Sequence, residues 1–296
     1  MKIAITGATG FVGSALAAFL TTQGHQVVKF SRSSGPDTVR WDPARQQIDL
    51  AALRGIDALV HLAGANLAEG RWTTARKRVL ADSRVQSTRW LVELLARLAD
   101  RPRIFVCASA IGFYGNTGDT PVDEHAPAGT GFLADLCVAW ENEARRAESW
   151  GARVVLLRSG AILAANGGAL EKLLPVFRAG LGGVVAGGHQ WMGWIALDDA
   201  LAAIAHVLGQ EDFRGPVNLV APGAVTNAEF SKTLAQVLHR PAVMHVPAAA
   251  LRLMVGEMAD AVVLASSRVR PARLQECGYG FRFPELEPAL RHVLGG

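Results

Sequence analysis

Apolar and polar residues follow two different patterns along the first half of the chain. Short aliphatic runs, typical of buried strands, occupy Ile3–Thr6, Gln26–Ser31, Asp57–Leu62, Arg103–Ser109 and Arg153–Arg158. Between them, apolar residues recur at helical spacing over Phe11–Thr22, Arg76–Ala99 and Phe132–Trp150. Because short strands alternate with helices, we predict an α/β fold, a doubly wound parallel sheet with helices on both faces.

The second half of the chain is less regular. Helices are predicted near Ala169–Ala179 and over Asp198–Leu208 and Asn227–Leu238, the last with Asn227 as its N-cap, and a strand is predicted over Val217–Val220. From Arg240 onward the pattern is mostly helical, with breaks at Pro247, Pro271 and Pro284. We therefore predict a large domain over residues 1–239, with substrate-pocket segments in its second half, and a smaller, mostly helical C-terminal domain over residues 240–296.

Composition narrows the class of protein. The chain has 296 residues, of which 50% are hydrophobic and 19% charged, as is typical of a globular protein with a large core. The net charge of +4 is spread along the chain, which does not favour a nucleic-acid partner. The longest uncharged stretch, Ala179–Leu197, holds six glycines and is interpreted as loop-rich, not as a membrane span. The first residues are already predicted to form a strand, so we expect no signal peptide.

Three cysteines are present, Cys107, Cys137 and Cys277, and no two are spaced as a CxxC pair. Such a sparse, odd set favours neither a disulfide framework nor a zinc site. Each lies in an apolar stretch, so each is expected to be a small buried side chain. This pattern favours a reducing compartment, and we expect a cytoplasmic protein without a bound metal.

The strongest motif is a glycine-rich turn between the first strand and the first helix. It reads Gly7-Ala8-Thr9-Gly10-Phe11-Val12-Gly13, a GxxGxxG spacing. Gly7 permits a tight turn, Gly10 lets backbone N–H groups approach a pyrophosphate, and Gly13 lets the helix pack close to the strand. The N-terminus of the helix would then attract the anion. The turn predicts dinucleotide binding by a Rossmann-type sheet.

The end of the second strand decides which dinucleotide is preferred. In proteins that bind NAD an acid at this place holds the ribose hydroxyls, whereas here the sequence continues Phe30-Ser31-Arg32-Ser33-Ser34. A guanidinium pairs with a 2′-phosphate, which a carboxylate would repel. We therefore favour NADP over NAD, with Ser31 and Arg32 as the discriminating residues. A solvated surface arginine is the alternative.

Together with these motifs, two later segments resemble a known family. Asp57–Gly64 reads DALVHLAG, and Ser109–Gly115 reads SAIGFYG. The chain resembles an extended short-chain dehydrogenase/reductase of the NAD(P)-dependent epimerase/dehydratase type. More narrowly it is similar to the YfcH-like "epimerase family" branch, on segments that include Arg71-Trp72-Thr73, Trp191-Met192-Gly193-Trp194-Ile195 and Pro271-Ala272-Arg273-Leu274. The resemblance covers essentially the whole length, including the C-terminal domain of unknown function that marks this branch.

The resemblance implies roles for several positions. Residues of the glycine-rich turn would cradle the pyrophosphate, and the segment after the third predicted strand would pass near the adenosine and ribose. Arg84 takes the place where relatives usually carry an asparagine on the helix beneath the cofactor. The implied cofactor residues, with the two discriminating residues included, are Gly7, Thr9, Gly10, Phe11, Val12, Gly13, Ser31, Arg32, Leu62, Ala63, Gly64 and Arg84.

The catalytic pair of the family is missing. Active members use a YxxxK pair about 20–30 residues after the strand that carries the serine. Phe132 stands roughly where the tyrosine would be and Leu136 where the lysine would be. A phenyl ring cannot transfer a proton, and leucine supplies no cation to lower a phenol pKa.

Two residues are candidates for the remaining chemistry. Tyr114 follows the Ser109 strand and is the best substitute acid or base, although a packed tyrosine that anchors its loop is the alternative. Ser109 lies where relatives carry the serine that binds the reacting oxygen, and a simple hydrogen bond at the strand end is its alternative.

Two further segments are candidates for substrate contacts. An arginine beside a flat aromatic ring can clamp an anionic or planar group, and glycine-rich backbone can cover a ligand. In each case a packing role is the alternative. The candidate residues are Arg71, Trp72, His189, Gln190 and Trp191.

These observations predict an NADP-dependent oxidoreductase or epimerase-like protein that acts on an unidentified small molecule, sugar-nucleotide-like compounds included. The alternative is a catalytically weak or inactive module that senses NADP and signals through a partner. The sequence leaves open whether the chain forms a homodimer.

Overall fold

The centre of the molecule is one eight-stranded sheet. We describe it from a computed structural model, in which residues 1–32, 35 and 37–295 are described. The strand order is β13-β8-β6-β5-β1-β2-β3-β4, and every pair is parallel except β3 with β4. The strands are β1 (Lys2–Thr6), β2 (Gln26–Ser31), β3 (Thr38–Asp42), β4 (Gln47–Ile48), β5 (Ala58–His61), β6 (Ile104–Ala110), β8 (Arg153–Ser159) and β13 (Gly215–Leu219). This order reverses direction at β1, as in a Rossmann-type sheet.

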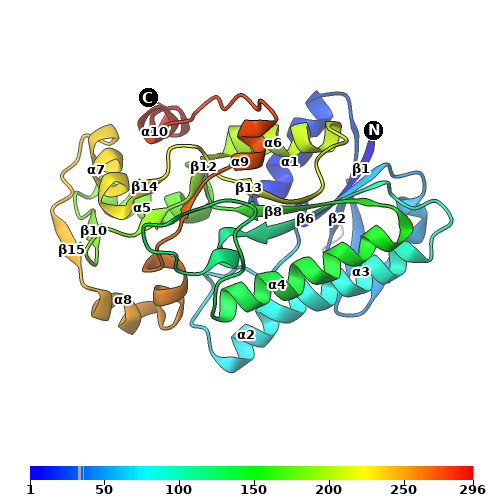
Figure 1. Cartoon of the computed structure of the whole chain (residues 1–296), viewed down its shortest axis with the longest axis horizontal. Coiled ribbons are helices and arrows are strands. Elements are labelled where there is room, and N and C mark those ends of the chain that lie inside the picture. Colours follow the sequence, from blue (N-terminus) through cyan, green and yellow to red (C-terminus); the bar gives the residue numbers. More distant parts are fainter. Residues whose placement is uncertain (33–34, 36, 296) are drawn as a thin grey trace.

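Helices cover both faces of the sheet, which confirms the predicted layering. On one face α1 (Phe11–Thr22) and α6 (Leu197–Gly209) pack on strand residues such as Ile5 and Val155. On the other face α3 (Ser87–Ala96) and α4 (Phe132–Arg145) lie side by side over residues such as Leu59 and Phe105 (Figure 1). Burial on both faces explains why these strands are continuous apolar runs.

The long helical pattern over Arg76–Ala99 folds as one helical rod with an internal irregularity. It consists of α2 (Thr74–Ala81), a π-helical turn η2 (Asp82–Gln86) and α3. A π turn inserts an extra residue into the helical hydrogen-bond ladder and thereby redirects the side chains within it, and such turns are frequent at functional sites. Arg84 is the central residue of this turn.

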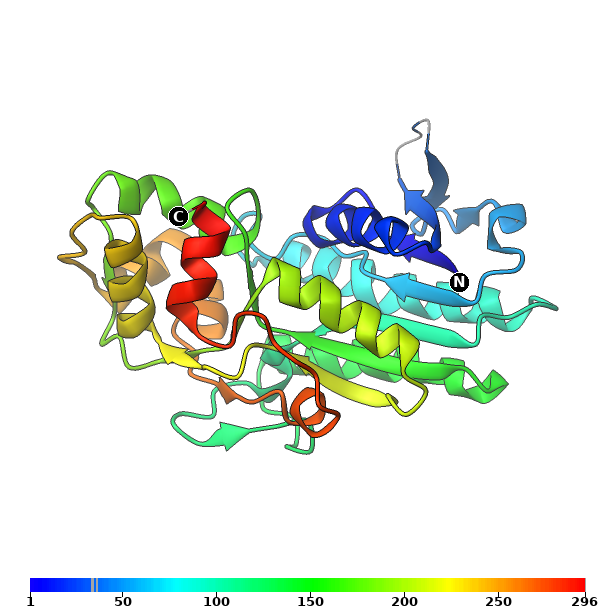
Figure 2. The same ribbon diagram turned by 90° about the horizontal axis from the view of Figure 1, so that it is seen from above.

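A second group of elements lies at the far end of the molecule from the N-terminus (Figure 2). It contains α5 (Gly168–Arg178), α7 (Asn227–Val237), α8 (Ala248–Val255) and α10 (Leu286–Leu294). Helices α5, α7 and α10 share a core that includes Leu170, Phe230 and Leu290. Short strand pairs join it to earlier segments: β10 (Gly183–Val185) with β15 (Met244–Val246), β11 (Trp191–Met192) with β14 (Val225–Thr226), β12 (Trp194–Ala196) with β9 (Ala161–Leu163), and β16 (Arg268–Val269) with β7 (Pro121–Val122). The tail also carries α9 (Ala272–Glu276), which packs beside β13.

Several sequence predictions need correction. The N-cap of α7 is Thr226, whose hydroxyl accepts from the Glu229 N–H while the Glu229 carboxylate accepts from the Thr226 N–H. This reciprocal capping box satisfies two backbone donors. It places the N-cap one residue before the predicted Asn227, which is the first residue of the helix. Cys107 and Cys137 are buried as predicted, whereas Cys277 is exposed because it follows the short helix α9 on the surface. Within the described residues, no helix is long and apolar enough to cross a membrane.

Candidate functional site

The glycine-rich turn between β1 and α1 is built so that two of its positions, Gly7 and Gly13, exclude a side chain. Gly7 has a φ of +71°, and a Cβ there would lie 2.9 Å from the Ala63 nitrogen. At Gly13 a Cβ would overlap the carbonyl oxygen of Gly7, so α1 approaches β1 as closely as backbone atoms allow. The Gly10 N–H donates to the Gly7 carbonyl at 3.0 Å and closes the turn. Because L-residues rarely adopt a positive φ, the turn requires glycine at position 7.

The N-terminus of α1 is open to an anion. Its N-cap is Gly10, which has no side chain to accept from the first N–H groups of the helix, and no acidic residue lies in the first turn. Thr9 and Gly10 are exposed, so no side chain of the described residues fills the mouth of the turn. Free N–H groups and the helix dipole at such an end favour a phosphate. The Phe11 ring packs against Gly167 and Gly168 and frames one side of the turn.

The end of β2 carries no carboxylate at the position where an NAD-binding fold places one. Ser31 is buried and Arg32 is exposed, while residues 33 and 34 lie outside the described part of the chain. The sheet register brings a second arginine here, because Arg40 on β3 pairs directly with Ser31 and its side chain is exposed. Sequence reasoning missed Arg40 because it did not predict β3.

A cavity of about 320 Å³ lies on the other side of β1, at the carboxyl ends of β5, β6, β8 and β13. Its wall is mostly apolar. Five residues predicted for the site line it, namely Val12, Leu62, Gly64, Arg84 and Ser109. Sequence reasoning did not predict five residues of α4 and β8 that also line it, namely Leu133, Cys137, Trp140, Leu157 and Ser159. In this fold ligands bind at the carboxyl ends of the strands where the order reverses, which is where this cavity lies.

Arg84 enters this cavity from the π-helical turn η2. The centre of its guanidinium lies 5.3 Å from the centre of the Trp140 ring, and the guanidinium also faces Gly64. A Cβ at Gly64 would lie 3.1 Å from that guanidinium carbon, so glycine leaves room for it. Burial lowers the pKa of Arg84 to about 10, which keeps it charged at neutral pH.

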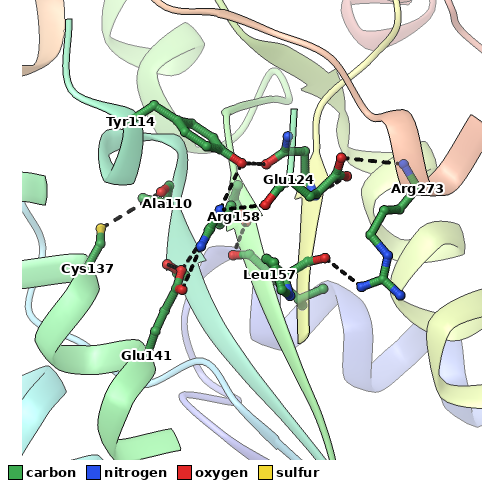
Figure 3. A network of polar contacts seen from close by, with 12 residues as sticks. Ala110, Tyr114, Glu124, Cys137, Glu141, Leu157, Arg158 and Arg273 are labelled. Carbon is green, nitrogen blue, oxygen red and sulfur yellow. Dashed lines mark hydrogen bonds and ion pairs between the residues drawn. The ribbon is translucent and has the colours of Figure 1, made fainter. Parts of the chain in front are cut away.

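Ser109, at the end of β6, is held by a buried ion pair. Its hydroxyl donates to Glu141 Oε1 at 2.7 Å. Glu141 also accepts from Arg158 at both oxygens, from Nε at 2.8 Å and from Nη2 at 2.9 Å (Figure 3). Both charged side chains are 3% exposed. Because an ionised carboxylate can only accept, the Ser109 proton is committed to Glu141, and its lone pairs are left to accept from a ligand hydroxyl.

Tyr114 belongs to the same network and is turned away from the cavity. It ends a 3₁₀ turn (Ile111–Tyr114), is 2% exposed, and is not among the residues that line the cavity. Its hydroxyl donates to Asn218 Oδ1 at 2.7 Å and accepts from Arg158 Nη1 at 3.0 Å (Figure 3). Burial raises its pKa to about 12, which opposes proton transfer at neutral pH. This geometry favours the alternative that the sequence left open, a packed tyrosine that anchors its loop.

We therefore expect Tyr114→Phe to affect stability and not cofactor binding. Removing the hydroxyl leaves the buried Asn218 carbonyl and one Arg158 N–H without a partner. The cost is about 1–3 kcal/mol in the free energy of unfolding. Urea unfolding measures this loss, and an NADPH titration of the folded variant is expected to match the wild type. A variant of unchanged stability with weakened cofactor binding contradicts this assignment.

Leucine and phenylalanine stand at the two positions where the family's catalytic pair would be, and both are placed by the structure. Leu136 lines the cavity with its aliphatic side chain. Phe132 packs edge-on against Trp72, with ring centres 5.3 Å apart, and the Lys77 ammonium lies 5.0 Å from the Phe132 ring centre. Lys77 is ion-paired to Glu257 instead of reaching the cavity lining.

The five residues predicted to contact substrate do not line this cavity. Trp72 is 6% exposed and donates its indole N–H to the Leu67 carbonyl, while Arg71 donates to the Leu253 carbonyl. Gln190 is buried with its amide bound to backbone carbonyls, and Trp191 donates to Asp119 on the surface. His189 is exposed. The contacts of Arg71, Trp72, Gln190 and Trp191 are with the protein itself, which favours the alternative of a packing role for them.

The network around Ser109 was not predicted, because its members are far apart in the sequence. The sequence assigned no role to Glu141 on α4 or to Arg158 on β8. One signal in the sequence could have found them: a glutamate in a helix predicted to be buried and an arginine at the end of a buried strand. Such charged residues are rarely buried without a partner. Across the described residues, no group of histidine, cysteine and acidic side chains could hold a metal ion.

Comparisons with known proteins agree with this geometry. The family described as "NAD dependent epimerase/dehydratase family" matches residues 3–220, and a domain of unknown function (DUF1731) matches residues 246–293. The epimerase family protein Mb2239 of Mycobacterium bovis is 41% identical over 294 residues, covering 98% of this chain and 97% of its own.

Two solved structures are also similar over the whole chain. The crystal structure of the human epimerase family protein SDR39U1 (isoform 2) with NADPH gives a TM-score of 0.92 at 32% identity, covering 100% of this chain and 99% of that one. A nucleoside-diphosphate sugar epimerase from Corynebacterium glutamicum gives a TM-score of 0.83 at 34% identity, covering 100% of this chain but 58% of its own length.

Proposed function

Because the chain belongs to the NAD dependent epimerase/dehydratase family, we propose that it binds NADP and acts on a small molecule by hydride transfer. The observation that carries this proposal is the glycine-rich turn, where Cβ atoms at Gly7 and Gly13 would meet backbone and where the helix N-terminus has no capping side chain. This cradle fits a pyrophosphate. The human relative SDR39U1, crystallised with NADPH, supports the choice of cofactor.

In this proposal the two halves of the cofactor lie on opposite sides of β1. Gly7, Thr9, Gly10, Phe11, Val12 and Gly13 hold the pyrophosphate. Ser31 and Arg32, with Arg40 beside them, receive the 2′-phosphate at the end of β2. Leu62, Ala63 and Gly64 lie along the path toward the cavity, where the nicotinamide half is bound.

The bound cofactor supplies the hydride chemistry, and the protein supplies binding and orientation. Ser109 accepts a hydrogen bond from the substrate hydroxyl, because its own proton is committed to Glu141. The apolar walls from β8 and α4 exclude water around the reacting carbon. Cys137 also lines the cavity, but burial raises its pKa to about 11, which disfavours the thiolate.

Cofactor fluorescence tests this proposal directly. Purified protein is titrated with NADPH and with NADH, and the emission of the reduced nicotinamide is followed. We expect NADPH to bind more tightly than NADH. Binding of neither cofactor overturns the proposal.

The role of Arg32 gives a separate prediction. Arg32→Ala is expected to weaken NADPH binding about tenfold or more, because a charge-assisted pair with the 2′-phosphate is lost. Binding of NADH, which lacks that phosphate, is expected to be unchanged. Arg78→Ala is the matched control, since the Arg78 side chain is 85% exposed on α2, outside the proposed site. Equal effects of both variants on NADPH contradict the assignment.

A second function is favoured by the missing YxxxK pair and by the buried position of Tyr114. In this second function the protein binds NADP and signals the bound state of the cofactor to a partner, and it converts substrate slowly or not at all. A screen of carbonyl and nucleotide-sugar substrates at the nicotinamide absorbance, with Ser109→Ala as a control, separates the two. Turnover that is lost in Ser109→Ala supports the enzyme, whereas tight NADPH binding without turnover supports the sensor.

A further inference from the structure

Arg84 is the only charged side chain that lines the cavity in the described part of the chain. Its contacts with acceptors are long, 3.4 Å to the Leu80 carbonyl and 3.5 Å to Ser83 Oγ, and no ion pair involving it is found among the described residues. The carboxylate of Glu141 is bound to Ser109 and Arg158 and does not line the cavity. The cavity therefore carries one uncompensated positive charge.

The structure holds this charge in place. Arg84 lies at the centre of the π-helical turn η2, its guanidinium faces the Trp140 ring, and Gly64 leaves the space that it fills. The walls around it include Leu62, Leu133 and Leu136. In such an apolar setting a charge is screened far less than at the surface, so it acts strongly on any other charge in the same cavity.

The position of the cavity decides which part of a dinucleotide this charge meets. The 2′-phosphate residues Ser31 and Arg32 lie at the end of β2, on one side of β1, and the pyrophosphate turn lies at β1 itself. The cavity lies on the opposite side, at the ends of β5, β6 and β8. A dinucleotide laid across the turn therefore has its nicotinamide half in this cavity. The nicotinamide ring is neutral when reduced and carries one positive charge when oxidised.

We infer that Arg84 makes this protein discriminate between the oxidation states of its cofactor, binding NADPH more tightly than NADP⁺; the inference rests on the proposed cofactor site. The oxidised ring meets a like charge that the reduced ring does not. Two like unit charges about 10 Å apart, at an effective dielectric constant of about 20, repel strongly enough to change an affinity by about tenfold. Such a protein remains loaded with NADPH in the presence of NADP⁺, which suits a reductase and equally a sensor of the NADPH pool.

The test compares affinities and does not depend on turnover. NADPH is titrated by fluorescence and NADP⁺ by calorimetry or by competition, on the wild type and on Arg84→Met and Arg84→Lys. We expect the wild type to bind NADPH about tenfold or more tightly than NADP⁺. Arg84→Met is expected to remove most of this ratio by binding NADP⁺ relatively better, and Arg84→Lys, which keeps the charge, is expected to retain it.

Control measurements separate this inference from the proposed function. Adenosine 2′,5′-bisphosphate, which lacks the nicotinamide half, is expected to bind wild type and Arg84→Met equally. If neither NADPH nor NADP⁺ binds the wild type, the proposed function fails. If both bind the wild type with equal affinity, the cofactor site stands and the inference about Arg84 is overturned. Equal weakening of both by Arg84→Met, with the ratio unchanged, makes Arg84 a phosphate contact and also overturns it.

Discussion

Gly13→Ala is expected to lower the affinity for NADPH by about ten- to hundredfold. The added Cβ would overlap the Gly7 carbonyl oxygen, and it would lie 2.8 Å from the carbonyl carbon and 3.0 Å from the Ala8 Cα. Every one of these atoms is backbone, so no side chain can rotate away, and α1 must move off the turn. Relieving such an overlap costs about 1–3 kcal/mol. Because the turn must keep its geometry to hold the cofactor, this cost reduces the free energy of NADPH binding. NADPH fluorescence measures the change in affinity.

The control for this prediction is Gly209→Ala at the end of α6. A Cβ at Gly209 meets no atom within 4 Å, so the same chemical change adds no overlap there. Circular dichroism and urea unfolding establish that Gly13→Ala is folded before it is titrated. Wild-type affinity in a folded Gly13→Ala variant contradicts the proposed pyrophosphate cradle.

The regular parts of the fold were accessible from the sequence because they depend on local patterns. The bounds of α1 and β2 agree with the structure to the residue, and the parallel sheet follows from the βα alternation. The strands β3 and β4 were missed because they are short, polar and at the edge of the sheet. The π-helical turn was also missed, since the apolar spacing of Arg76–Ala99 continues through it.

The candidate site also has parts that depend on local sequence patterns and parts that depend on long-range contacts. The glycine-rich turn is a local motif, and its geometry could be read from the spacing of three glycines. The direction of Tyr114 could not, because it is set by Asn218, 104 residues later, and by Arg158, 44 residues later. Arg71, Gln190 and Trp191 likewise have hydrogen-bond partners that lie far away in the sequence. The loop position of Tyr114 predicts a place near the carboxyl edge of the sheet, whereas its long-range hydrogen bonds hold it outside the cavity lining.

Glu141→Gln is expected to lower the free energy of unfolding by about 3–5 kcal/mol. The carboxylate accepts from Ser109 and twice from Arg158, and it and Arg158 are almost fully buried. Glutamine has the same size, but its amide N–H groups would face donors, and the Arg158 charge would be left in the interior without its counterion. Removing one partner of a buried ion pair costs far more than removing an exposed one, because desolvation of the other is no longer offset. Urea unfolding followed by circular dichroism gives the difference.

The matched control is Glu287→Gln on α10, which breaks an ion pair of similar length, 2.7 Å to Arg291, with both side chains about half exposed. Its expected cost is below about 1 kcal/mol, because solvent screens the pair. The double variant Glu141→Leu with Arg158→Met removes both buried charges and is expected to recover much of the stability lost in Glu141→Gln. Recovery assigns the loss to the stranded Arg158 charge. If Glu141→Gln costs no more than Glu287→Gln, the pair does not hold the end of β6, and the position of Ser109 at the cavity must then be set by the backbone of the sheet alone.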